Sequence, residues 1–305
     1  MEEPRGIGQG MTQAPDLPVS LLVDPDWLAG NLDRVVLLDA SVARIDRPGG
    51  VTGFGSGADV FAGKHLPGAR LADLFGGFSD ADAPLSFTRP SVDVLERSAR
   101  ELGVNRDSVV VVYDRLGGAY AARIWLLFRS VGFDRVRVLN GGLQAWTAAG
   151  GAVESGPSAP VALGDFRAGP LREEFVSTEE VARLVAGGGD AMRPLVCGLR
   201  PPQFTGEGSD DPRLGHIPGS VNLPFSELLD EEGRLDLNRV ETRLKALALP
   251  EGSVPVLYCG GGINASGLAL ALVATGHSEF RVYEASMSGW TLDPSRPVAR
   301  GKATA

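Results

Sequence analysis

The chain has 305 residues, long enough for two compact domains, and carries a formal net charge of −9, with 38 acidic against 29 basic residues. This acidic balance, without any dense run of lysine and arginine, argues against nucleic acid or an anionic membrane as partner. With 2 cysteines and 3 histidines, neither a disulfide framework nor a metal site is expected. No stretch approaches the roughly 20 apolar residues of a membrane span, and no secretion signal is visible, so we expect a cytoplasmic protein.

The first half of the sequence alternates strand-like and helix-like segments, after an N-terminus over 1–17 that is predicted to be disordered. The patterns predict a strand over 35–40, a glycine-rich loop over 53–63, a helix over 90–102, a strand over 109–113, an apolar helix over 119–131, a strand over 136–139 and a short helix over 142–149. Strands that alternate with helices are typical of an α/β domain with a mostly parallel sheet covered on both faces.

A Pro-, Gly- and Ser-rich segment over 151–172 interrupts this order and is interpreted as a linker. We therefore expect one domain over 18–150, a second over 173–298, and a tail over 299–305. The second half predicts a capped helix from 177, strands over 195–197, 256–258 and 281–283, a helix over 240–247, an apolar helix starting near 264, and a final helix that contains Trp290.

An internal repeat relates the two halves. The turn His65-Leu66-Pro67-Gly68 returns as His216-Ile217-Pro218-Gly219, and each turn is followed by an apolar strand that ends in a loop. Asp114 opens the first loop and Cys259 opens the second. Aspartate cannot carry a transferred sulfur atom, so only the second half can perform thiol chemistry. The tryptophans that follow, Trp146 and Trp290, are predicted core anchors.

The loop that begins at Cys259 is the main candidate site. Gly260, Gly261 and Gly262 let the backbone curl, and the helix that follows offers N–H groups without intrahelical partners. Such N–H groups favour an anion, which for a cysteine is the reactive thiolate. Cys197 lies inside an apolar strand and is predicted to be structural. A tyrosine-phosphatase-like site would need an arginine six positions after the cysteine, and Ala265 stands there, which excludes that alternative.

Several motifs resemble those of two-domain rhodaneses, the family of thiosulfate and 3-mercaptopyruvate sulfurtransferases. They are the two His-x-Pro-Gly turns, Tyr113-Asp114, Ala121-Ala122-Arg123-Ile124-Trp125, Leu139-Asn140-Gly141-Gly142 and Tyr258-Cys259-Gly260-Gly261-Gly262, spread over residues 21–290. The resemblance implies two tandem rhodanese-like domains, the first of them inactive. It also implies a persulfide on Cys259, no cofactor, and transfer of sulfur to cyanide, a thiol or a thioredoxin-like acceptor.

The residues after Cys259 bear on the donor. Gly260, Gly261, Gly262, Ile263 and Asn264 are closer to the Cys-Gly-Ser/Ala-Gly-Val-Thr loop of mercaptopyruvate enzymes than to the cation-bearing loop of thiosulfate enzymes. We therefore expect a mercaptopyruvate-like donor, or an unusual persulfide, rather than thiosulfate. Asn264 is also a good N-cap residue, so helix capping is its other interpretation.

The resemblance also places donor-binding arginines where this chain has Leu199 and Gln203, so two positive charges that members of the family carry are missing here. Arg213 matches a further family arginine. Arg200 stands one position after the family arginine position that Leu199 occupies, and it either reaches into the cleft between the domains or is solvated. His65 is a weaker candidate, because the resemblance puts a first-domain histidine near the interdomain cleft, although a hydrogen bond that stabilises its turn is the alternative.

These departures leave three functions open. The first, which we favour, is a sulfurtransferase with a small-molecule donor. The second is a relay that hands a persulfide to a partner protein. The third is a non-catalytic rhodanese-like protein used for interaction. The first two require sulfur on Cys259 and the third does not.

Overall fold

The computed structural model describes residues 18, 20–47, 51–207, 211 and 214–302. The predicted disorder over 1–17 and the candidate Arg213 lie outside these residues. Within them, no helix is both long enough and apolar enough to cross a membrane.

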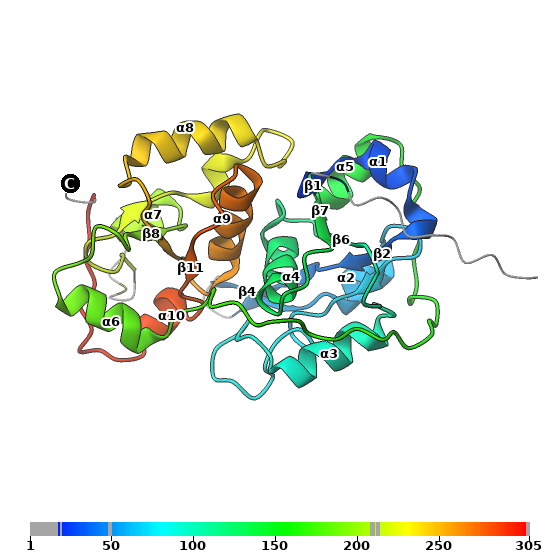
Figure 1. The fold of residues 1–305 in the computed structure, drawn as a ribbon, viewed down its shortest axis with the longest axis horizontal. Helices are drawn as coiled ribbons and strands as arrows, with labels where there is room; N and C mark the ends of the chain where they lie inside the picture. Colours follow the sequence, from blue (N-terminus) through cyan, green and yellow to red (C-terminus); the bar gives the residue numbers. More distant parts are fainter. Residues whose placement is uncertain (1–17, 19, 48–50, 208–210, 212–213, 303–305) are drawn as a thin grey trace, which may run out of the picture.

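Two parallel sheets, one in each half of the chain, form the framework (Figure 1). The first has the strand order β1 (Leu22–Val23), β7 (Val136–Leu139), β6 (Val110–Tyr113), β2 (Val36–Asp39) and β5 (Arg70–Leu71). The second has the order β11 (Arg281–Val282), β10 (Val256–Tyr258), β8 (Leu195–Cys197) and β9 (Val221–Asn222). The last four strands of the first order and the four of the second match in place, as the repeat requires, and the predicted α/β class is confirmed.

Helices cover these sheets. In the first half they are α1 (Pro25–Ala29), α2 (Ala58–Gly63), α3 (Val92–Glu101), α4 (Ala119–Ser130) and α5 (Gly142–Ala148), with the 3-10 turn η1 (Leu32–Arg34). In the second half they are α6 (Thr178–Ala186), α7 (Pro201–Thr205), α8 (Leu237–Leu247), α9 (Ile263–Ala274) and α10 (Ser286–Trp290), with η2 (Phe225–Leu228). Most were predicted to within a few residues, but α1, α2, α7 and both 3-10 turns were not.

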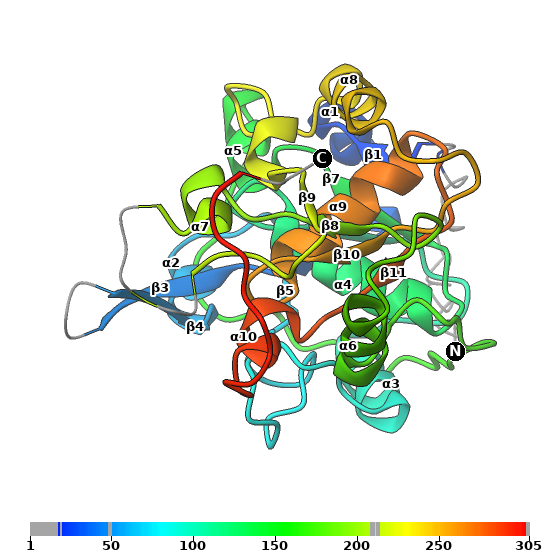
Figure 2. The ribbon, with the colours of Figure 1, turned by 90° about the vertical axis from the view of Figure 1, so that its left-hand side faces the viewer.

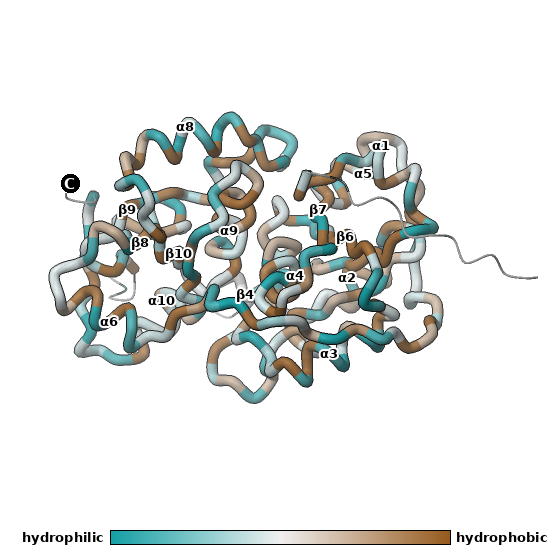
Figure 3. The backbone as a smooth tube through the Cα atoms, viewed as in Figure 1, coloured by the Kyte–Doolittle hydropathy of each residue, from teal (hydrophilic) through white to brown (hydrophobic). Residues whose placement is uncertain are grey.

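Strand β6 shows why the first sheet is buried on both faces. Successive side chains of a strand point to opposite faces. Val110 and Val112 join the core that contains α4, whereas Val111 and Tyr113 join a second core with residues of α1, α2 and α5. In Figure 3 the tube is largely brown along β6, and the outer helix α8 alternates between brown and teal.

The two halves meet where α4 packs against α9, side by side in Figure 1. Both helices are apolar around almost their whole circumference, which is typical of helices buried on all sides. Small residues let α9 pack closely: a Cβ on Gly267 would lie 2.6 Å from the ring of Phe225. This packing holds the loop before α9, which contains Cys259, against the first half.

The predicted glycine-rich loop over 53–63 is wrong. The segment forms the end of β4 (Val51–Ser56), which pairs antiparallel with β3 (Val42–Arg47), and then helix α2. The glycines of this segment allow close packing. The Ile45 side chain lies across Gly55, where a Cβ on Gly55 would be 2.5 Å from Ile45 Cδ1, and Gly57 lies against the Ser41 carbonyl. The hairpin β3–β4 extends away from the first sheet (Figure 2).

The segment predicted as a linker carries no helix or named strand in the structure, yet it packs on the first half. Glu154 pairs with His65 through two backbone hydrogen bonds of 2.8 and 2.9 Å. Phe166 is fully buried between the rings of Phe128 and Phe133, with centroid distances of 5.3 and 5.2 Å.

Candidate active site

Cys259 follows β10 at the carboxyl edge of the second sheet, where α/β proteins place their sites. Its residue is only 3% exposed. The segment after β11 fixes the loop from one side: the Cys259 N–H donates to Ser286 Oγ (3.0 Å), and the Cys259 carbonyl accepts from the Met287 N–H (3.0 Å). Ser288 holds Gly260 through its N–H (2.8 Å) and its hydroxyl (2.7 Å), both to the Gly260 carbonyl. The backbone of Cys259 is therefore held rigidly.

The equivalent loop of the first half shows what such a turn binds. The carboxylate of Asp114, which is 1% exposed, accepts four backbone hydrogen bonds: its Oδ1 from Leu116 (2.8 Å) and Gly118 (2.9 Å), its Oδ2 from Tyr120 and Ala121 (both 2.9 Å). Burial nevertheless raises the pKa of Asp114, because desolvation outweighs these bonds. The loop and the first turn of α4 thus form a cradle of N–H groups around one side chain.

The loop of Cys259 repeats this design with one residue fewer between its first residue and the helix. Gly262 precedes α9 with φ 85°, as Gly118 precedes α4 with φ 87°. Only glycine adopts this backbone conformation without strain. In the described part of the chain, the first N–H of α9 that bonds a backbone carbonyl is that of Ser266, to Gly262 (3.1 Å). The N–H groups between Cys259 and Ser266 have no backbone acceptor in the described residues and are therefore available to an anion.

Asn264 does not cap α9, so that interpretation is wrong. The N-cap is Gly262, without a side-chain hydrogen bond. Asn264 is the second residue of the helix, and its Nδ2 donates to the Gly198 carbonyl (3.4 Å) at the end of β8. Ile263, the first residue of α9, is 8% exposed. Asn264 therefore ties the cysteine loop to the neighbouring strand.

A cavity of about 340 Å³ lies beside the loop. Its wall includes Gly260, Leu199, Gln203 and Met287, so the positions of both missing family arginines border one space next to Cys259. The remaining described lining residues are Asp211, Leu214, Gly215, Ser288, Thr291 and Leu292. None of the described lining residues is cationic, and one is acidic.

Comparison with known proteins agrees with this geometry. A family model described as Rhodanese-like domain matches residues 24–149 and 200–293. A Pseudomonas aeruginosa protein named "Probable 3-mercaptopyruvate sulfurtransferase" is 37% identical over 256 residues, 80% of this chain and 87% of that protein. The thiosulfate sulfurtransferase of Gallus gallus is 34% identical over 235 residues, 75% of this chain and 79% of the relative. The crystal structure of SseA from Escherichia coli, a 3-mercaptopyruvate sulfotransferase, superposes with a TM-score of 0.74 at 26% identity, covering 88% of this chain and 99% of SseA.

The chain belongs to the rhodanese family. With relatives of this similarity, it is a transferase of sulfur-containing groups.

The two histidine turns of this rhodanese are built alike. His65 Nδ1 lies 2.9 Å from the Phe61 carbonyl and its ring stacks on Phe61 at 3.9 Å; His216 repeats both contacts with Phe204, at 2.9 and 3.8 Å. These are the hydrogen bonds that the turn-stabilising interpretation predicts, and they occur also in the copy without a cysteine. In the described residues His65 makes no hydrogen bond, ion pair or ring stacking with the cysteine loop.

Of the other residues named from the sequence, Cys197 and the two tryptophans are buried, whereas Arg200 is exposed. Burial raises the pKa of the Cys197 thiol to about 12, which keeps this fully buried residue protonated and inert, as predicted. Trp146 and Trp290 are buried and donate equivalent hydrogen bonds to the Ala152 and Pro297 carbonyls (2.7 and 2.8 Å). Arg200 precedes α7 and is exposed to solvent.

Sequence reasoning missed the residues that approach the cysteine loop from elsewhere in this rhodanese. Ser286 is fully buried and accepts a hydrogen bond from the Cys259 N–H, but the sequence predicted its segment only as part of a final helix that contains Trp290. Tyr120, on α4 of the first half, is close enough for a charge on Cys259 to contribute to its raised pKa, after burial and the charge of Asp114. Neither pairing has a signal in the sequence, because Ser286 reaches Cys259 through the packing of α10 within the second half, and Tyr120 through the packing of the two halves.

Proposed function

We propose that this rhodanese moves a sulfane sulfur from a small donor to a nucleophilic acceptor through a persulfide on Cys259. The observation that carries the proposal is the cradle of four N–H groups around Asp114, repeated in design around Cys259. In the first domain the chain's own carboxylate fills the cradle. In the second the group at its centre can ionise and accept sulfur, so catalysis belongs to the second domain.

The chemistry has two steps. The Cys259 thiolate attacks the sulfur of 3-mercaptopyruvate, and the carbon–sulfur bond breaks. Pyruvate leaves as its enolate and takes up a proton, and Cys259 then carries the persulfide. The acceptor then attacks the outer sulfur, the sulfur–sulfur bond breaks, and the Cys259 thiolate is restored. Backbone N–H groups stabilise the sulfur anion before and after each transfer, without a counter-ion.

The donor is 3-mercaptopyruvate-like rather than thiosulfate. Thiosulfate is a dianion, and the cavity that Leu199 and Gln203 border has no cation among its described lining residues. Moving a dianion there without a partner charge costs more than moving a monoanion. Steady-state rates with both donors test this preference, and faster turnover with thiosulfate would reject it.

The acceptor is a thiol, cyanide or a thioredoxin-like protein. The free thiols of Cys197 and Cys259 suit a reducing compartment, and we propose that the enzyme works in the cytoplasm. Release of sulfur only to a protein would instead indicate a persulfide relay.

Intact mass tests the proposal directly. Exposure to 3-mercaptopyruvate should add about 32 Da, one sulfur atom, to the wild type and to Cys197→Ala. Cys259→Ser should gain nothing. Cyanide should then remove the added mass as thiocyanate. An unmodified wild type would mean a non-catalytic interaction protein, and a gain by Cys259→Ser would move the chemistry elsewhere.

A further inference from the structure

The proposed function leaves one charge unaccounted for. A mercaptopyruvate-like donor carries a carboxylate, and a carboxylate near a partly buried thiolate needs a cation. Two positions that carry arginines in relatives are Leu199 and Gln203 here, the matching Arg213 lies outside the described residues, and the only charged residue in the described wall of that cavity is the acidic Asp211. A cation from the first domain would supply this missing charge.

The β3–β4 hairpin carries such a group. Arg44 of β3 stands directly opposite Phe54 of β4, and residues opposite one another in an antiparallel pair share a face. The Phe54 ring contacts Tyr120, with centroids 5.8 Å apart. Arg44 thus lies on the face of the hairpin that is turned toward the start of α4.

Tyr120 connects this face to the cysteine. It is 6% exposed and packed between Phe54 and Phe87, whose ring centroid lies 6.0 Å away. The guanidinium of Arg44 lowers the pKa of Tyr120 and a charge on Cys259 raises it, against the larger effects of burial and Asp114. One phenol is therefore within electrostatic reach of both groups.

Arg44 is also available for a ligand. It is exposed, and in the described part of the chain it makes no hydrogen bond or ion pair. By contrast, Arg115 and Arg123 of the same domain are held by Asp39 and Glu284.

We propose that Arg44, on the hairpin of the first domain, binds the carboxylate of the sulfur donor at Cys259 and takes the place of the two second-domain arginines that this chain lacks. The inference rests on the proposed function. It also gives the first domain a part in donor specificity: the donor would bind between the domains, with its sulfur at Cys259 and its carboxylate toward the hairpin.

Alkylation tests the placement of Arg44 without any sulfur donor. Iodoacetate and iodoacetamide react with the same thiolate, but only iodoacetate carries a carboxylate. The ratio of their rates at Cys259 therefore reports a cation near the sulfur and cancels changes in thiol reactivity. We expect Arg44→Gln to lower the iodoacetate-to-iodoacetamide ratio about fivefold to tenfold, and Arg44→Lys to keep most of it.

Two further variants sharpen the result. Arg183→Gln removes an equally exposed charge from α6 and should leave the ratio within about twofold. Arg200→Gln tests the rival cation that precedes α7. A ratio unchanged in Arg44→Gln, or one that falls only in Arg200→Gln, would overturn the proposal. Melting temperatures and the iodoacetamide rate verify that each variant is folded.

Steady-state kinetics complete the test. With 3-mercaptopyruvate, Arg44→Gln should raise KM about tenfold, with a smaller change in kcat, and Arg44→Lys should restore it. Absence of turnover by the wild type would reject the proposed function, whereas the alkylation ratio would still decide the position of Arg44.

Discussion

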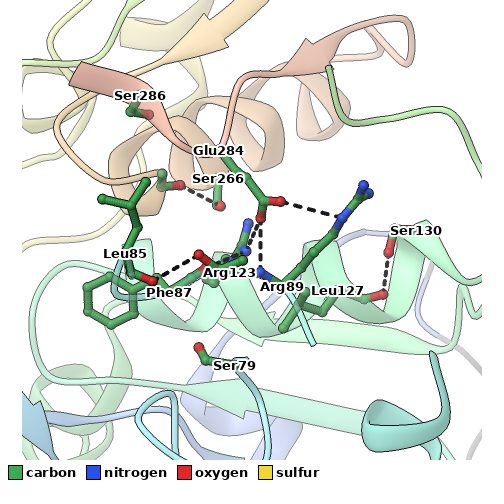
Figure 4. A network of polar contacts seen from close by, with 12 residues as sticks. Ser79, Leu85, Phe87, Arg89, Arg123, Leu127, Ser130, Ser266, Glu284 and Ser286 are labelled. Carbon is green, nitrogen blue, oxygen red and sulfur yellow. Dashed lines mark hydrogen bonds and ion pairs between the residues drawn. The ribbon is translucent and has the colours of Figure 1, made fainter. Parts of the chain in front are cut away.

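Arg123 and Glu284 form an ion pair between the two domains, with 2.6 Å between Nη2 and Oε2 (Figure 4). The same Nη2 donates to the Phe87 carbonyl (2.7 Å), and Arg89 reaches Glu284 from its backbone N–H (3.2 Å). Arg123 is fully buried. The backbone carbonyl of Glu284 lies so close to Gly262 that a Cβ on Gly262 would be 2.7 Å from its oxygen. The Arg123–Glu284 ion pair therefore adjoins the cysteine loop.

Removing the acidic partner should be costly. Glu284→Ala leaves the Arg123 guanidinium buried without its counter-charge, and we expect a loss of about 3 kcal/mol in the free energy of unfolding. Urea denaturation measures it. Asp134→Asn removes the exposed partner of Arg172 and should cost less than about 1 kcal/mol. Equal effects of the two substitutions would contradict a special role for the buried pair.

Asp114 should be essential to the first domain although it has no part in sulfur transfer. Asp114→Ala removes the acceptor of four N–H groups, two of them buried and two partly buried, and we expect a destabilisation of about 3 kcal/mol or more. Asp107→Ala, at an exposed position of the same domain, should change stability by less than about 0.5 kcal/mol. A stable Asp114→Ala variant would show that the cradle needs no anion, and would weaken the comparison with Cys259.

The local patterns of the sequence predicted most of the sheet-forming strands and the long helices. Both β6 and β10 are short apolar runs between turn residues, and Ser177 with Glu180 forms the capping box that the sequence indicates at the start of α6. The cysteine loop was likewise predictable, because its glycines are local signals.

What the sequence did not predict depends on contacts between distant segments. The end of β4 was taken for a loop because Gly53 and Gly55 are poor strand formers, whereas in the structure Gly53 pairs with Ile45 and the Ile45 side chain packs over Gly55. The helix cap was assigned to Asn264 although Gly262 provides it. The approach of Ser286 and Tyr120 to the cysteine follows from tertiary packing alone.

The hydroxyl of Ser286 should control the cysteine loop. Ser286→Ala removes the acceptor of the Cys259 N–H and the donor to the Tyr283 carbonyl (2.9 Å). We expect kcat for sulfur transfer to fall about tenfold, because the loop loses its fixed orientation. Ser288→Ala is the matched control: its side chain is exposed and its backbone N–H keeps the bond to Gly260, so kcat should fall less than about threefold. Equal losses would mean that Ser286 does not position the cysteine.

His216 should make stability depend on pH. Burial lowers the pKa of His216 below its usual value of about 6.5, although its hydrogen bond to Phe204 opposes the shift. Between the two values the unfolded chain binds more protons than the folded chain, so the free energy of unfolding rises with pH in this window and falls as pH drops below about 6.5. Denaturation between about pH 5 and 7 measures the slope. His216→Gln should flatten it, whereas His277→Gln, at an exposed position, should leave it unchanged. A slope that persists in His216→Gln would assign the dependence to other groups.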